Sequence, residues 1–235
     1  MSFKLINSYE NAGEAGGLVV VIDVLRAFTT SCFIAKNNAK QLIAVDDLKA
    51  ALKLKKKNPE YILIGERKGI KPEGFDHGNS PHEIKDIDFT GKTVVLTTTT
   101  GTRGVNRSVN ADEVITSSFV NAKAVADYIF KSRPNTVSFV CTDDSYFDNE
   151  DFLCASYIKS LIEKKPLNFA EIKSYLRKHP CSYGYIAKPL TKYAKEDFAL
   201  SLTVDTFDFV LRARNPESGN ITLEKVSINK CPLFC

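Results

Sequence analysis

The fold is decided by the run Leu18-Val19-Val20-Val21-Ile22 and by Asp23-Val24-Leu25-Arg26, which follows it without a break. Consecutive apolar residues, most of them β-branched, are typical of a strand buried on both faces of a parallel sheet. The run stops at Asp23, so it is too short to span a membrane, and no basic segment of the kind that opens a signal peptide precedes it. We therefore predict a central strand whose carboxyl end carries a carboxylate and a guanidinium.

Short apolar runs of this kind alternate with amphipathic segments along the chain. The runs predict strands at 18–22, 41–45, 61–64, 93–97, 113–116 and 136–141. Helical spacing of apolar residues predicts one helix that Asp46 caps and two more over 121–131 and 150–164. This alternation is typical of β-α units, so we expect a three-layer α/β/α fold with a mostly parallel sheet.

The pattern changes after Lys165. Helices are expected over 168–177 and 196–204, and the strand-like segments 207–212 and 221–227 flank the turn residues 215–220, which include Pro and Gly. That is the pattern of a β-hairpin. We predict one compact domain over residues 1–235 with a C-terminal helical and β-hairpin elaboration, and the alternative is a sub-lobe boundary near residue 165.

The composition excludes several classes of protein. The 235 residues carry 32 Lys and Arg against 28 Asp and Glu, a net charge of +4, with 43% hydrophobic residues. This is an ordinary composition for a cytoplasmic globular protein, so we expect neither nucleic acid nor membrane as a partner, whereas the oligomeric state stays open. Three histidines argue against a zinc hydrolase.

The six cysteines form no C-x-x-C pair. Cys32 and Cys154 fall on apolar helical faces, so reduced core thiols are expected. Cys231 and Cys235 could pair or bind metal, although chance spacing is the favoured explanation.

Four of the predicted strands end in segments with concentrated polar residues. Ligands of parallel sheets bind outside the carboxyl ends of the strands, so these segments are expected to form one site for an anion and a cation. They are Asp23 to Arg26, Gly65 to Gly69, Thr97 to Gly104, and Thr142 to Asp144 followed by Glu150-Asp151.

Two of the segments suggest phosphate binding. Thr97 to Gly104 combines hydroxyls and glycines ahead of an expected helix, as in a phosphate cradle, although it lacks the P-loop pattern and could be a Thr-rich strand end. Ser80, Pro81 and Glu83 form a capping box with proline at the first helical position. A capped helix explains those residues, but not the long loop that leads to them from Gly65, and such loops usually have a function.

The residues also restrict the chemistry. A Cys-x5-Arg phosphatase is excluded because Phe147 stands where the arginine would follow Cys141, and an Asp-x-Asp nucleophile is excluded because Leu25 follows Asp23 by two. An oxygen-rich set of side chains fits Mg²⁺ better than zinc. Attack by a carboxylate and attack by an activated water both stay open, and Cys141 is a weaker candidate nucleophile.

Taken in order along the chain, these motifs resemble the 2-phosphosulfolactate phosphatase family. The resemblance rests on Val21 to Ala27, Gly65-Glu66-Arg67, Gly74 to Glu83 and Leu96 to Thr102, and it continues with Cys141, Glu150-Asp151 and Glu196-Asp197. It implies an α/β fold and a Mg²⁺-dependent acid phosphatase acting on phosphate esters of 2-hydroxy acids. The named reaction converts 2-phosphosulfolactate into sulfolactate in coenzyme M synthesis.

The site that we infer from the strand ends and the resemblance has two catalytic carboxylates, Asp23 and Glu66. Both are expected as metal ligands together with Glu150 and Asp151. The expected phosphate-binding residues are Arg26, Arg67, Asn79, Ser80, Thr98, Thr99, Thr100, Gly101 and Thr102. The chain departs from the family pattern at Thr100, Asp143 and Tyr193, so the alternative function is a non-catalytic or altered-specificity binder of small anionic metabolites.

Overall fold

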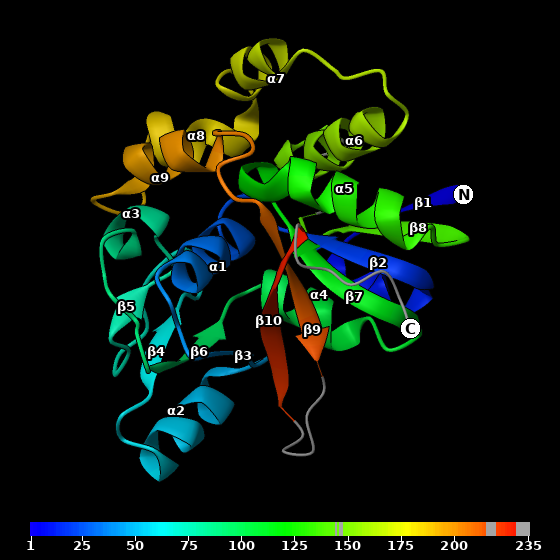
Figure 1. The fold of residues 1–235 in the computed structure, drawn as a ribbon. Helices are drawn as coiled ribbons and strands as arrows, with labels where there is room; N and C mark the ends of the chain where they lie inside the picture. Colours follow the sequence, from blue (N-terminus) through cyan, green and yellow to red (C-terminus); the bar gives the residue numbers. More distant parts are fainter. Residues whose placement is uncertain (144, 146–147, 215–219, 229–235) are drawn as a thin grey trace.

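The computed structural model describes residues 1–143, 145, 148–214 and 220–228, and its centre is one curled sheet (Figure 1). The strands lie in the order β1-β8-β2-β7-β9-β10-β3-β6-β4-β5. Their bounds are β1 Ser2–Asn7, β2 Gly17–Ile22, β3 Gln41–Ala44, β4 Ile62–Gly65, β5 His77–Gly78, β6 Thr93–Thr97, β7 Ala111–Ser117, β8 Thr136–Cys141, β9 Phe209–Arg214 and β10 Ile221–Ser227.

The sheet consists of two parallel halves joined by the C-terminal hairpin. One half is β1-β8-β2-β7 and the other is β3-β6-β4-β5, with every pairing inside each half parallel. Between them β9 pairs antiparallel with β7, and β10 pairs antiparallel with β3. The hairpin predicted as an elaboration is therefore the middle of the sheet, where β9 and β10 run between the halves (Figure 1).

Helices cover both faces of the sheet, which confirms the predicted α/β class with a mostly parallel sheet. The helices are α1 Ala27–Lys36, α2 Leu48–Lys57, α3 Pro81–Ile84, α4 Gly101–Arg107, α5 Ala122–Ser132, α6 Glu150–Ile162, α7 Phe169–Leu176, α8 Tyr183–Ile186 and α9 Ala194–Ser201. Alternate strand residues face opposite layers: Val19 and Val21 pack with α1, whereas Val20 and Ile22 pack with α5 and α6. On the other half of the sheet, α2 covers the outer face.

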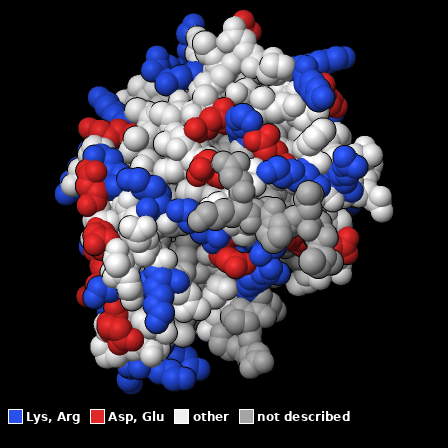
Figure 2. All heavy atoms as spheres, viewed as in Figure 1, with Lys and Arg blue, Asp and Glu red and all other residues white. Residues whose placement is uncertain are grey.

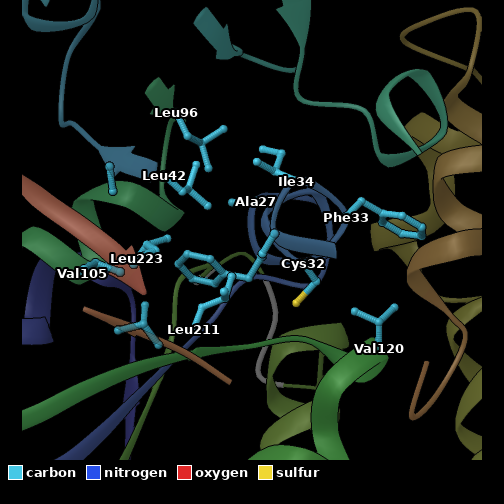
Figure 3. Close-up of a cluster of buried hydrophobic side chains, with 14 of the residues drawn as sticks. Ala27, Cys32, Phe33, Ile34, Leu42, Leu96, Val105, Val120, Leu211 and Leu223 are labelled. Atoms are coloured by element: carbon cyan, nitrogen blue, oxygen red, sulfur yellow. The ribbon is translucent and has the colours of Figure 1, made fainter. Parts of the chain in front are cut away.

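Helix α1 is the core of the inner layer, with every residue except Lys36 buried. Its Phe33, Ile34 and Cys32 belong to a core cluster that includes side chains from both half-sheets. Figure 3 shows them with Leu42 and Leu96 of one half-sheet and with Leu211 and Leu223 of the hairpin. A helix that is buried on all sides has no exposed polar face opposite an apolar stripe, so the sequence pattern did not predict α1. Because α1 begins at Ala27, shortly after β2 ends at Ile22, the buried helix holds the carboxyl end of β2 in place.

The sequence predictions of secondary structure are largely confirmed. All six predicted strands and the hairpin strands are present. Asp46 was the wrong cap, because Asp47 accepts the hydrogen bond from the Ala50 amide at 2.8 Å. Cys32 and Cys154 are buried free thiols as expected. Asp144, most of the turn 215–220, Cys231 and Cys235 lie outside the described residues.

The surface offers no large field of one sign on the face that Figure 2 shows, where Lys and Arg side chains are interspersed with Asp and Glu. Within the described part of the chain, no helix is long and apolar enough to cross a membrane.

We predict that Leu211→Ala in β9 lowers the free energy of unfolding by about 2–5 kcal/mol, because Leu211 is fully buried between the half-sheets. Leu5→Ala in the edge strand β1 is the matched control, since Leu5 is 47% exposed, and it should cost less than about 1 kcal/mol. Urea unfolding measures both. Equal losses would mean that the hairpin does not hold the halves together.

Candidate active site

The site begins at Asp23, the first residue after β2, which is 5% exposed. Its Oδ1 accepts the Ala27 amide at 2.8 Å and its Oδ2 accepts the Thr100 hydroxyl at 3.1 Å. Burial removes water from the carboxylate and raises the pKa of Asp23 to about 6. Asp23 therefore lies where the exit of β2, the start of α1 and the segment before α4 meet.

Gly101 allows the start of α4 to lie this close to the exit of β2 and the start of α1. A Cβ added at Gly101 would lie 2.6 Å from Ala27 Cβ and 2.7 Å from Asp23 Oδ2, closer than side-chain atoms approach one another. The close contact between α4 and the exit of β2 is by itself a physical reason for glycine at position 101, and the phosphate-binding role expected of Gly101 stays a prediction.

The threonines ahead of α4 hold the segment together. Thr98 and Thr102 exchange hydrogen bonds, each amide donating to the other's hydroxyl at 3.1 Å. The Thr99 amide donates to Glu66 Oε1 at 2.7 Å, and its hydroxyl donates to Glu66 Oε2 at 3.0 Å. The hydroxyls of the expected phosphate cradle therefore make hydrogen bonds to other groups of the protein.

Glu66, at the end of β4, connects two of the predicted segments. Besides the two bonds from Thr99, its Oε2 accepts the Gly69 amide at 2.7 Å. Arg67 turns away from it and donates to the carbonyls of Glu66 and Asp46 and to the Thr97 hydroxyl, at 2.6, 3.1 and 2.8 Å. Glu66 and Arg67 thus fix the loop between β4 and β5 against the end of β6.

Asp151 likewise connects two of the predicted segments, on the other half of the sheet. Its Oδ1 accepts the Val24 amide at 2.8 Å, and its Oδ2 accepts the amide and hydroxyl of Thr142 at 3.0 and 3.2 Å and the Asp143 amide at 3.3 Å. Burial and the neighbouring Glu150 raise the pKa of Asp151 well above its ordinary value. Asp151 ties the exits of β2 and β8 together.

Glu150 is the least satisfied of these carboxylates. It is 5% exposed, and its Oε2 has no hydrogen-bond partner among the described residues. Burial raises the pKa of Glu150 to about 7, and the charges of Asp143 and Asp23 add to the shift. The nearby thiol of Cys141 is no better placed as a nucleophile, because burial raises its pKa well above the ordinary value.

Arg26 leads to a residue that the sequence prediction missed. Its Nη1 donates to Asp197 Oδ2 at 2.6 Å, and Asp197 in α9 is fully buried. Asp197 Oδ1 accepts the Ser80 hydroxyl at 2.6 Å and the His82 amide at 3.0 Å. In the sequence, Asp197 was named only within the Glu196-Asp197 pair of the family resemblance, without a role, and the structure shows that it is buried on α9 with Ala194 and Ser201.

The capping box at α3 forms only in part. Ser80 caps the helix by accepting the Glu83 amide at 3.1 Å, and Pro81 stands in the first turn as predicted. The Glu83 side chain instead accepts the Gly78 amide at 3.3 Å and contacts His77 Nδ1 at 3.1 Å. Asn79 is 4% exposed, and its Oδ1 lacks a partner within the described part of the chain.

The structure shows the contacts of Thr100, Tyr193 and Asp143, at which the chain departs from the family pattern. Thr100 supplies a hydrogen bond to Asp23, Tyr193 packs on the His82 ring with centroids 5.0 Å apart, and Asp143 Oδ1 accepts the Ser145 amide at 2.9 Å. Asp143 also contributes to the raised pKa of Glu150, so its carboxylate adds negative charge near the site.

Charge is the most unusual property of this site. Among the described residues, the buried acidic side chains are Asp23, Glu66, Glu150, Asp151 and Asp197, and Arg26 is the only buried Lys or Arg. All of them lie at the carboxyl ends of the strands or pack on Arg26. Buried carboxylates in excess of buried cations require protons or a bound cation.

The carboxylate oxygens at this site fit a hard cation that takes most of its ligands from water and from the substrate. In the described ranges no three His, Cys, Asp or Glu side chains converge as a complete metal cage. Mg²⁺ does not need one, because it binds one or two carboxylates and keeps its remaining positions for water and phosphate oxygens. Glu150 Oε2, which has no partner among the described residues, and Asp23, which accepts one hydrogen bond on each oxygen, match that requirement.

Comparison with known proteins gives a consistent picture. A family model described as 2-phosphosulpholactate phosphatase matches residues 5–216. A probable 2-phosphosulfolactate phosphatase of Caldicellulosiruptor saccharolyticus is 38% identical over 88% of this chain and 91% of its own. One from Caldanaerobacter subterraneus subsp. tengcongensis is 36% identical over 91% and 95%, and one from Carboxydothermus hydrogenoformans is 44% identical over 72% and 68%.

We predict that Gly101→Ala lowers kcat/KM at least about 100-fold, because the new Cβ must displace Asp23 or Ala27. Steady-state kinetics and circular dichroism separate loss of geometry from loss of fold. Gly13→Ala is the control, since the nearest atom to its added Cβ lies 3.7 Å away. Full activity of Gly101→Ala would refute the close contact.

Proposed function

The chain belongs to the 2-phosphosulfolactate phosphatase family, and we propose that it hydrolyses 2-phosphosulfolactate to sulfolactate and inorganic phosphate with Mg²⁺ as its cofactor. The observation that supports the cofactor and the site is the excess of buried carboxylates over buried Lys and Arg side chains among the described residues. A dianionic phosphoryl group can enter such a place only together with positive charge, which a divalent cation supplies.

We assign Asp23 and Glu150 as the carboxylates that hold the cation. Glu66 and Asp151, also expected as ligands, accept three and four hydrogen bonds from neighbouring segments, whereas Asp23 accepts two, so we assign Glu66 and Asp151 to positioning. When bound, Mg²⁺ supplies Lewis-acid stabilisation of the charge that develops on the phosphoryl oxygens.

The protein's own groups bind and orient the ester. The Arg26 guanidinium is a forked donor that matches two phosphoryl oxygens, and it stands three residues after Asp23. The backbone of Thr100 and Gly101 borders Asp23 on the other side. Because these segments are buried, they also exclude bulk water from the reacting phosphorus.

Two finer points belong to the same proposal. We place the reaction in coenzyme M synthesis, where the sequence resemblance puts it. We place the protein in the cytoplasm, because a reducing compartment suits the buried free thiols of Cys32 and Cys154.

We expect purified protein with Mg²⁺ to release phosphate from 2-phosphosulfolactate, and also from 2-phospholactate, since both are esters of 2-hydroxy acids. Chelation should remove the activity, and Mg²⁺ but not Zn²⁺ should restore it, because the site offers carboxylates. A phosphate-release assay measures this. Activity that survives chelation would contradict the role of the cation, and stabilisation by the esters without turnover would favour the non-catalytic binder.

We expect Asp23→Asn to reduce turnover at least about 100-fold while the protein stays folded. Burial raises the pKa of Asp23 from 3.8 to about 6, so ionisation lowers the stability of the metal-free protein as the pH rises through that window. At pH 7.5 without metal, the asparagine variant should therefore melt no lower than wild type. Added Mg²⁺ should raise the melting temperature of wild type alone. Equal stabilisation of both proteins would place the cation elsewhere.

A further inference from the structure

Asp197 joins three segments that are far apart in the sequence. Its Oδ2 holds Arg26 at the junction of β2 and α1, and its Oδ1 holds the hydroxyl of Ser80 and the amide of His82 at the start of α3. The carboxylate itself belongs to α9 and is fully buried. No expectation from the sequence gave it a role beyond its part in the family resemblance.

The same contacts restrict the Arg26 guanidinium from several sides. Its Nη2 donates to the Gly69 carbonyl at 3.3 Å, and its Cζ lies 5.7 Å from the centre of the Tyr185 ring. The Tyr185 hydroxyl in turn donates to the Leu25 carbonyl at 3.3 Å, which fixes the ring. Asp197 thus completes a frame around a side chain that would otherwise rotate about its long stem.

These contacts do not use all the hydrogen-bond donors of the Arg26 guanidinium. Each terminal nitrogen of a guanidinium carries two hydrogens, and the contacts to Asp197 and Gly69 use one on each. The second hydrogens and Nε–H stay available to an anion. The pairing also neutralises a cation that is only 6% exposed, so Arg26 can be kept in place before substrate arrives.

We propose that Asp197 is a positioning residue, which holds Arg26 in the orientation that binds the phosphoryl group of the ester. This inference rests on the proposed phosphatase function. If the proposal is correct, a change at Asp197 alters substrate binding through Arg26. The same change has no such effect when Arg26 can no longer bind phosphate.

The test is a double-mutant cycle of Asp197→Asn and Arg26→Gln, in which the double variant has no buried charge at either position. KM for 2-phosphosulfolactate and the inhibition constant for inorganic phosphate are measured with Mg²⁺. Asp197→Asn alone should raise both about tenfold with a smaller change in kcat. In the Arg26→Gln background it should change them less than about twofold. Asp205→Asn is the control and should leave both constants unchanged, because within the described part of the chain this exposed carboxylate accepts only the Lys123 amide, at 2.9 Å.

Equal effects of Asp197→Asn in both backgrounds, or no effect on KM in the wild-type background, would overturn the proposal. If Asp197→Asn does not fold, Ser80→Ala takes its place in the cycle, since it removes one bond to Asp197 and keeps the charge. If wild type hydrolyses no ester, the proposed function fails, and the same cycle is measured by the thermal stabilisation that inorganic phosphate gives.

Discussion

The structure depends on the cost of burying carboxylates. Each buried acid at the strand ends must find donors or a cation, and most of the local architecture supplies donors. Asp151 collects hydrogen bonds from the exits of β2 and β8, and Glu66 collects them from Thr99 and Gly69. Glu150 Oε2 has no partner within the described residues and Asp23 has one hydrogen bond on each oxygen, so these two acids keep the most capacity to bind a cation.

The sheet explains why the acids meet. Between the two parallel halves lie three antiparallel pairings, β7 with β9, β9 with β10 and β10 with β3. The strands of one half therefore run opposite to those of the other, and in a flat sheet their carboxyl ends would lie at opposite edges. The curl of the sheet around α1 brings them together (Figure 1). The contact of Gly101 with Asp23 and Ala27 is where the halves touch, and it leaves no room for a side chain.

The sequence predicted what local chemistry determines and missed what tertiary contacts determine. β-Branched runs gave the central strands, and Ser80 with Pro81 gave the start of α3. Strand β1 was missed because it is a largely exposed edge, and α1 because a fully buried helix has no polar face. The position of the hairpin inside the sheet also depends on partners distant in the sequence.

The candidate site divides in the same way. Hydrogen bonds connect the strand-end segments as the rule for parallel sheets predicts, and the catalytic, metal and phosphate-binding roles given to their residues stay predictions. Thr98 and Thr102 use their hydroxyls on their own loop, because short polar side chains bond readily to nearby backbone. The sequence placed Asp197 in the family resemblance without a role, and its contact is with Arg26, 171 positions earlier in the chain.

The most direct test of this account is a crystal structure of the chain grown with Mg²⁺ and inorganic phosphate. The account predicts the cation about 2.0–2.1 Å from an Asp23 carboxylate oxygen, with Glu150 beside it and phosphate oxygens on the Arg26 guanidinium. A cation bound away from Asp23, or phosphate bound elsewhere while Arg26 contacts only protein, would contradict it.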